Sequence, residues 1–503
     1  MMSMSAQDKS RAIGMWGLAL CLLAVAAGWM FMRFGQAWSM ADLPESDNIA
    51  RIVPAYVVTE IAMIPVGGKL IDRWGVRRVL LIAPLVFIIG SLLCIASTSV
   101  EMLVLFRSIQ GLGAGLMLAL AFTSVGKFYD PAKRGKCHEL MTGAFAFGSL
   151  FASAVGYYLT TMFDWRAGFM VLAAMMAIGA FMAWKFLPQE EPSDVKSDPI
   201  SLVLAAILFG AAALYTQMVN VDFDLVSIPS AVIAVVIIVM LILLMHHAKR
   251  VEDPAIPVGI TSFEKKLIIL MFAFSLCGLG LIQYFFKLYL SFYEFDIYNA
   301  SFMFIFLILG AAGPSIVGSR KVFSTGIRPW VLIGSLVVAA SLVLTHFIAD
   351  DGITQFAICV FLFGMGLGFI VTEILCSLQA VVEKRHMGQH TGNLMAVRMI
   401  GILVGNAIVG SYIKEVNHSN YEQTVIDLTT TDNVLSEIAT TILSNIEYAA
   451  SSLRDGLLST VLVMAVASIV LGILAYTLRK DDVEAIEAFE GSEDAPEEEA
   501  PAE

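Results

Sequence analysis

Long apolar segments recur along the whole chain, and short polar stretches separate them. Each of fourteen such segments is long enough to cross the hydrocarbon core of a bilayer as a helix. They cover residues 12–40, 49–66, 79–97, 101–126, 137–160, 165–187, 200–219, 226–246, 264–290, 297–318, 328–349, 354–380, 388–412 and 455–478. Because a backbone in lipid must satisfy its hydrogen bonds within the segment, we expect helices. The pattern predicts an all-α polytopic membrane protein with 14 transmembrane helices.

Lysine and arginine are distributed unequally between the two sets of alternate loops. With the N-terminus in the cytoplasm, the predicted cytoplasmic segments hold 23 of the 31 Lys and Arg residues, and the outer segments hold four. Cytoplasmic loops of membrane proteins carry such an excess. The sequence thus predicts a multi-pass protein of the cell (plasma or inner) membrane with both termini in the cytoplasm. Residues 413–454 form the longest outer loop, with a surface helix expected from Asn433.

The amino-acid composition excludes several classes of protein. The chain is 58% hydrophobic and only 15% charged, which excludes a soluble domain. Residues 481–503 hold 11 of the 43 acidic residues and predict a disordered cytoplasmic tail, so the net charge of −12 says little about partners. The sequence contains no P-loop, no G-x-S-x-G and no zinc-ligand spacing, and its six cysteines are scattered in or beside apolar segments. We therefore expect neither an enzyme nor a nucleic-acid-binding protein, and no metal or cofactor.

The most distinctive stretch joins the second and third predicted spans. Its glycines and charged residues are Gly68, Asp72, Arg73, Gly75, Arg77 and Arg78. Gly68 and Gly75 permit close approach or unusual backbone geometry, and Asp72 offers a carboxylate to a helix N-terminus or an arginine. The pattern G-x-x-x-D-R-x-G-x-R-R resembles the signature loop of the major facilitator superfamily of transporters. That resemblance implies a gating loop that holds the cytoplasmic face of one half of the protein against the other.

Further segments resemble the fourteen-helix drug:proton antiporter branch of that superfamily. They are Ala41–Pro44, Asp164–Arg166 and Gly388–Gly392 with the following Arg398 and Gly401. The segment Arg107–Gly115 resembles a motif of the whole superfamily, which that resemblance links to proton coupling. The branch has an aspartate in the first helix, and Gly35 stands at that position here. The antiporter motif of the fifth span lacks its proline, because Ser149 occupies that site. These departures weaken the expectation of antiport of cationic drugs.

Five glycines repeat at a fixed offset. Shifting the chain by 253 residues places Gly111, Gly113, Gly115, Gly135 and Gly148 on Gly364, Gly366, Gly368, Gly388 and Gly401. Transporters of this superfamily use parallel half-repeats of this kind. We expect a six-helix half at residues 1–187, two inserted helices at 188–250, a second six-helix half at 251–480 and the tail at 481–503.

Charged residues inside the apolar segments are the candidates for proton coupling. They are Glu60, Arg107, Glu373 and Arg398. A charge in hydrocarbon is costly, and a buried acid is often protonated, so it can exchange a proton during transport. Structural roles remain open for each of them. Glu60 could be a fixed partner of Arg33, Arg51 or Arg107. Glu373 could be a fixed partner of Arg398. Arg107 could be a hydrogen-bond donor to Gln110 or to the backbone.

Polar and aromatic residues of the first and ninth spans are candidates for lining a substrate cavity. They are Arg33, Gln36, Trp38, Gln283 and Lys287. Such residues more often serve packing or face lipid, which stays an alternative. The two cations Arg33 and Lys287 favour an anionic substrate, unless neighbouring acids neutralise them.

The sequence is most consistent with a monomeric secondary transporter that exports amphipathic small molecules, with protons as the coupling ion, by alternating access. This places it among efflux antiporters of the multidrug-resistance type. One alternative is a uniporter or exchanger of organic anions or metabolites. The other is a transporter-like membrane protein that only senses or scaffolds. The partners expected are a small-molecule substrate, protons and the lipid bilayer.

Overall fold

A computed structural model describes residues 6–43, 48–190, 195–218, 227–257, 261–277, 297–348, 352–428, 465–470 and 472–473. Within these ranges all regular secondary structure is helical. The α-helices are α1 (Ala6–Asp42), α2 (Ile52–Trp74), α3 (Val76–Ile95), α4 (Val100–Phe128), α5 (Pro131–Met162), α6 (Trp165–Phe186), α7 (Pro199–Met218), α8 (Ile228–Ala248), α9 (Ser262–Cys277), α11 (Ile297–Thr325), α12 (Arg328–Ile348), α13 (Ile353–Val381) and α14 (Met387–Leu428). Short 3-10 turns, η1 (Ile49–Arg51) and η3 (Lys384–His386), precede α2 and α14.

Ten of the described helical segments are long and apolar enough to cross a membrane. The chain is therefore an all-helical, multi-pass membrane protein, and the number fourteen stays a prediction. Much of the expected ninth span, most of the fourteenth and the surface helix from Asn433 lie outside the described residues.

Two helix ends differ from the sequence prediction. The second span was expected to end at residue 66 and a loop to follow, but α2 continues to Trp74 and α3 begins at Val76, so Gly75 alone joins them. The polar residues of the stretch do not end the helix, because Lys69 and Asp72 are buried against other parts of the protein. Gly75 has φ 78°, in the region that favours glycine. At the other end of the chain, α14 runs on to Leu428 instead of ending at 412.

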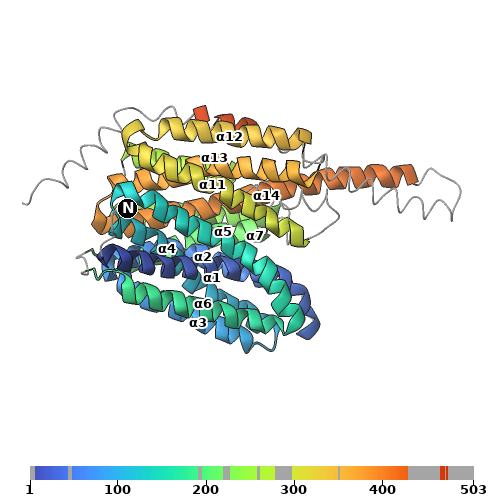
Figure 1. The fold of residues 1–503 in the computed structure, drawn as a ribbon. Helices are drawn as coiled ribbons and strands as arrows, with labels where there is room; N and C mark the ends of the chain where they lie inside the picture. The colour runs from blue at the N-terminus through green and yellow to red at the C-terminus, as the bar shows by residue number, and fades with distance from the viewer. Residues whose placement is uncertain are drawn as a thin grey trace, which may run out of the picture.

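The helices form two groups that lie side by side (Figure 1). The first group comprises α1 to α6, and the second comprises α9 and α11 to α14. Helix α4 packs against α2 and α3, and α13 packs in the same way against α11 and α12. Helices α2 and α5 of the first group also pack against α14 and α11 of the second. Helices α4 and α13 also contact α14 and α5 across the same seam.

The glycine repeat identified in the sequence corresponds to equivalent packing in the two groups. A Cβ on Gly111 would overlap the Tyr56 carbonyl of α2, and one on Gly113 would meet α3. In the second group, Gly364 faces α11 and Gly366 faces α12 in the same manner. Small residues at these positions let the helix backbones approach closely, which is the main source of helix association in lipid.

Helices α7 and α8, which the sequence predicts as an inserted pair, pack against each other, and α7 also contacts α2 and α14. At one end of the pair, the Tyr215 and Ser230 hydroxyls are hydrogen-bonded at 2.8 Å. At the other end, His247 Nε2 lies 2.6 Å from Asp198 Oδ2. Much of α8 is apolar and exposed, as expected for a helix that faces lipid.

The repeat glycines predict a position-specific loss of stability. We expect Gly368→Ala to destabilise the protein by about 1–3 kcal/mol, because its Cβ would overlap the Ala311 carbonyl of α11. Gly313→Ala is the matched control, since a Cβ there meets no atom within 4 Å. Thermal unfolding of the detergent-solubilised variants, followed by size-exclusion chromatography, measures the difference. Equal midpoints for the two variants would contradict the close packing of α11 and α13.

Candidate functional site

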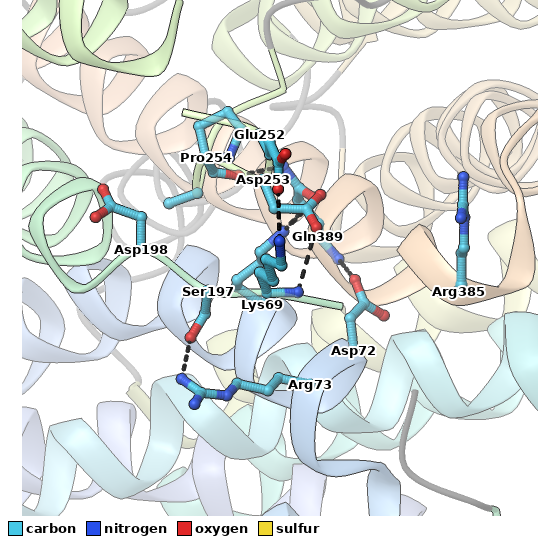
Figure 2. A network of polar contacts seen from close by, with 12 residues as sticks. Lys69, Asp72, Arg73, Ser197, Asp198, Glu252, Asp253, Pro254, Arg385 and Gln389 are labelled. Atoms are coloured by element: carbon cyan, nitrogen blue, oxygen red, sulfur yellow. Dashed lines mark hydrogen bonds and ion pairs between the residues drawn. The ribbon is translucent and has the colours of Figure 1, made fainter. Parts of the chain in front are cut away.

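Asp72 caps the N-terminus of α14. Gly388 N donates to Asp72 Oδ1 and Gln389 N donates to Oδ2, both at 2.7 Å, and the carboxylate is buried (Figure 2). The first N–H groups of a helix have no partner within the helix and carry its positive partial charge. The sequence left two partners open for this carboxylate, a helix N-terminus or an arginine, and the structure places a helix N-terminus there. The helix that it meets begins more than 300 residues later in the chain.

The backbones of α2 and α14 are in direct contact beside this carboxylate. A Cβ on Gly68 would overlap the Gly388 carbonyl oxygen, and a Cβ on Gly388 would overlap that of Gly68. A Cβ on Gly392, one turn further along α14, would lie 3.1 Å from Gly68 Cα. We call the end of the bundle at which Asp72 and Gly388 meet the signature end. Its closure depends on the absence of side chains at these glycines.

Two lysines connect the contact between α2 and α14 to neighbouring segments. Lys127 Nζ of α4 lies 3.6 Å from Asp72 Oδ1 and 2.9 Å from Glu190 Oε1. Lys69 Nζ donates to Gln389 Oε1 at 3.1 Å and lies 3.6 Å from Asp253 Oδ1. The buried charges at this end therefore have opposite charges or hydrogen-bonding groups close to them, as a buried ion pair requires.

The segment that follows the inserted helices also joins this network, as Figure 2 shows. Gln389 Nε2 donates to the Pro254 carbonyl at 2.6 Å, and Asn393 Nδ2 donates to the Ala255 carbonyl at 3.0 Å. Residues 253–255 thus contact both α2, through Lys69, and α14. Residues 253–255 were not identified from the sequence as part of this network.

The arginines of the signature stretch lie away from the Asp72 contact. Arg73 donates to Ser197 Oγ, and the Arg77 guanidinium lies 4.9 Å from the centre of the Trp184 ring. Arg73 and Arg78 are exposed. Of the six residues expected to gate, the structure therefore places Gly68 and Asp72 at the contact between the two groups and Gly75 at the link between α2 and α3.

A second bridge between the groups was missed in the sequence. Arg134 of α5 donates to the Gln379 carbonyl of α13 at 2.6 Å and to the Gly126 carbonyl at 3.0 Å. His138 Nε2 lies 2.8 Å from Gln379 Oε1. The repeat contained a signal for this bridge. Gly135 corresponds to Gly388, so Arg134 lies at the position that begins α14 in the second half.

A cavity of about 150 Å³ lies between the two groups, lined by α1, α5, α11, α13 and α14. Its lining is mainly apolar, and its polar members include Glu139, Thr142, Ser315, Thr372 and Arg398. Arg398 was expected from the sequence, and Glu139 was not. The side chains of the five residues expected to line the cavity, Arg33, Gln36, Trp38, Gln283 and Lys287, fall outside the described part of the structure.

Arg107 is fully buried in the first group. Its guanidinium donates to Gln110 Oε1 and, at 2.8 Å, to the Gly28 carbonyl of α1, and it lies 4.2 Å from the centre of the Tyr56 ring. These contacts join α1, α2 and α4. They are the contacts expected if Arg107 has a structural role, namely hydrogen bonds donated to Gln110 and to the backbone.

Glu60 and Glu373 are also fully buried, but their carboxylates have no hydrogen-bond partner among the described residues. Within that part of the structure, Glu60 forms no ion pair with Arg107 and Glu373 none with Arg398. An ionised carboxylate in this situation is costly. The structure therefore separates paired charges at the signature end from unpaired acids deeper in the bundle.

The sequence profile described as Major Facilitator Superfamily matches residues 18–406, more than half of the chain. The protein belongs to the Major Facilitator Superfamily. It is a membrane transporter and not an enzyme. Multidrug resistance protein 3 of Bacillus subtilis (strain 168) is 24% identical over 81% of this chain and 80% of its own length. Multidrug transporter protein MdtP of the same organism is 21% identical over 82% of this chain and 76% of its own length.

Solved structures of other superfamily members have the same fold. The human organic anion transporter MFSD10 aligns with a TM-score of 0.63 over 94% of this chain and 100% of its own, at 14% identity. The proton:xylose symporter XylE aligns with a TM-score of 0.59 over 96% of this chain and 99% of its own, at 12% identity. At such identities the likeness concerns the fold alone. The names of the curated relatives fit the resemblance to the drug:proton antiporter branch.

The Asp72 contact predicts the exchange behaviour of two backbone amides. In Asp72→Asn, we expect the Gly388 and Gln389 amides to exchange with deuterium faster, because the variant replaces charge-assisted hydrogen bonds worth about 1–3 kcal/mol by weaker ones. Each 1.4 kcal/mol corresponds to about tenfold in an opening equilibrium. Asp130→Asn, at an exposed carboxylate, is the control. Unchanged exchange in both variants would show that Asp72 does not stabilise the closed signature end.

Proposed function

We propose that this protein exports amphipathic small molecules in exchange for protons, by alternating access of the cavity to the two sides of the membrane. The observation that carries the proposal is the pair of fully buried acids, Glu60 and Glu373, without a hydrogen-bond partner in the described part of the structure. Burial favours the uncharged form of such a group, and hydration favours the charged form. A change in the access of water would therefore bind or release protons.

The closed signature end supports alternating access. The bridges from Asp72 to α14 and from Arg134 to α13 connect the two groups on one side of the cavity. Breaking these few polar contacts, together with the glycine contact of α2 and α14, would open the cavity to that side. Because each group is internally packed through its own glycines, the two groups can separate as units.

The cavity and the relatives support an amphipathic substrate and export. A pocket lined mainly by apolar side chains with a few polar groups binds molecules of mixed character. Two curated relatives that share about four-fifths of this chain carry multidrug names. We infer that the substrates are drug-like and that the protein acts as a monomer, because the cavity lies within a single chain.

For orientation, we propose that the signature end faces the cytoplasm, in the cell membrane, with both termini on that side. The support is the excess of Lys and Arg in the segments that this orientation places inside. We also propose fourteen helices, with halves at 1–187 and 251–480, the inserted pair at 188–250 and the tail at 481–503.

This orientation predicts that the end of α14 lies outside the cell. A cysteine introduced within 413–428 should react with a membrane-impermeant maleimide added to intact cells, because the helix extends beyond the predicted span. A cysteine at Lys133, an exposed position of the signature end, should react only after the cells are permeabilised. The reverse pattern would invert the orientation.

Proton coupling predicts a specific defect in Glu60→Gln. In proteoliposomes with an imposed pH gradient, we expect the wild type to concentrate rhodamine 123 and the variant to lose this accumulation while still exchanging the probe. Glutamine keeps the shape of the side chain but cannot release a proton. Glu101→Gln, at an exposed acid, should behave as the wild type. Full accumulation by Glu60→Gln would remove Glu60 from the coupling mechanism.

Arg398 favours organic anion transport as a second candidate function. Its side chain lines the cavity, and among the described residues its only hydrogen bond is to the Met395 sulfur, at 4.0 Å. A cation in that position favours an anionic group in the ligand. Fluorescein shares the xanthene core of rhodamine 123 but is an anion, so the same vesicles compare the two charges. Transport of fluorescein alone, lost in Arg398→Gln, would establish the second candidate in place of the first.

A further inference from the structure

Two acids from different groups of helices converge at the edge of the cavity. Glu139 of α5 lines the cavity and faces the Ser315 hydroxyl of α11. Glu373 of α13 is fully buried beside the cavity and follows Thr372, which lines it. Glu139 lies at Ser315 and the Glu373 carboxyl group lies at Gly318, three residues further along α11, so the charge of one acid acts on the other. The two carboxyl groups thus lie on opposite sides of the seam.

Helix α11 shapes the space between them. Ser315 and Gly318 are three residues apart and share one face of this helix. A Cβ on Gly318 would overlap Glu373 Oε1, so the glycine makes the room that the carboxyl group occupies. Ser315 donates to the Gly368 carbonyl at 3.1 Å, and the Thr372 hydroxyl lies 3.3 Å from Ser315 Oγ. These hydrogen bonds join α11 to α13 beside the acids.

Both oxygens of Glu373 are buried and lack a hydrogen-bond partner among the described residues, and so does the Ser377 hydroxyl one turn along α13. The Glu373 carboxyl group occupies the space beside Gly318, and it has no hydrogen-bond donor in this part of the structure. A proton stabilises an acid in such a place, since no cation or amide of the described residues is bonded to the carboxylate. The neighbouring Glu139 strengthens this requirement, because two carboxylates at one site disfavour double ionisation.

Other titratable groups surround the acids, but their hydrogen bonds are directed elsewhere. They are Arg134, Cys137 and His138 on α5, Cys376 on α13 and Arg398 on α14. Arg134 donates to three backbone carbonyls, and His138 is hydrogen-bonded to Gln379. Arg398 lines the same cavity without forming an ion pair with either acid within the described residues.

The acids also break the symmetry of the repeat. At the offset of 253 residues, Glu139 corresponds to Gly392 and Glu373 corresponds to Leu120. The repeat glycines maintain equivalent packing in the two groups, whereas neither acid has an acidic counterpart. This asymmetry favours a role specific to the assembled protein over a role in the packing of one half.

We propose that Glu139 and Glu373 form one shared proton-binding site at the seam, which holds a single proton while the signature end is closed. The inference rests on the proposed function, because it assigns to this pair a proton exchanged during transport. A carboxylate of the pair binds a proton from the open side and becomes a neutral acid. Separation of α5 from α13 hydrates both groups, and the proton is released to the side of the signature end.

Dicyclohexylcarbodiimide tests the pair without any transport substrate, because it modifies protonated carboxyl groups in apolar surroundings. Peptide mass spectrometry measures the modification of Glu373 as a function of pH in the purified protein. In Glu139→Gln, we expect the midpoint of this profile to move down by about one pH unit or more, since the neighbouring negative charge is gone. Glu139→Asp keeps the charge and should keep the profile.

Two further measurements make this experiment decisive. Glu60→Gln removes a buried acid elsewhere in the bundle and should leave the Glu373 profile unchanged. In the reciprocal variant, Glu373→Gln, the modification profile of Glu139 should move in the same direction. An unchanged Glu373 profile in Glu139→Gln, or an equal shift in Glu60→Gln, would overturn the shared site.

Transport separates failure of this inference from failure of the proposed function. We expect Glu139→Gln to lose rhodamine 123 accumulation driven by a pH gradient and Glu139→Asp to retain it. Full accumulation by Glu139→Gln would overturn the role of the pair in coupling, even if the labelling profiles shift. A wild type that shows no proton-driven accumulation would instead refute the proposed function, and the labelling profiles would still decide whether the pair shares a proton.

Discussion

The contact of α2 with α14 is the interaction on which the closed state of this protein depends. Two backbones meet at Gly68 and Gly388 with no side chain between them, and Asp72 satisfies the amides that this proximity buries. Each feature requires the other, because a carboxylate in this position would lack donors without the helix terminus. A helix terminus buried there would likewise lack acceptors without the carboxylate. The neighbouring lysines complete the compensation of charge.

Buried charges are treated in two ways in the same bundle. At the signature end they have partners, and each partner comes from a different segment, so the charges hold segments together. In the interior, Glu60 and Glu373 have no partner in the part of the chain that the structure describes. Paired charges resist a change of protonation, whereas unpaired acids respond to the presence of water. The division thus assigns cohesion to one region and proton exchange to another.

The sequence predicted the helices well, because apolar length and charge distribution act locally. The glycine repeat also had a direct structural counterpart, since the repeated glycines of α4 and α13 leave no room for a Cβ against the neighbouring helices. The sequence failed where contacts join distant segments, as with Arg134 and Gln379, which are 245 residues apart. Glu139 was missed because it stands close to the basic residues that start α5, and apolar periodicity does not tell which face meets a cavity. The signature stretch was taken for a loop because its polarity suggested exposure, whereas Lys69 and Asp72 are buried by partners from elsewhere in the chain.

The segment after the inserted helices has a consequence for the architecture of the chain. Residues 253–255 give Lys69 an ion-pair partner and Gln389 an acceptor, and Ala255 N also donates to Ser201 of α7. On the other side of the pair, Lys196 N donates to Asp253. The two connections of the inserted pair are thus bound to each other and to the junction of the halves. Excision of the pair would leave polar groups at that junction without partners, so a form of the chain without α7 and α8 would need a different set of residues there.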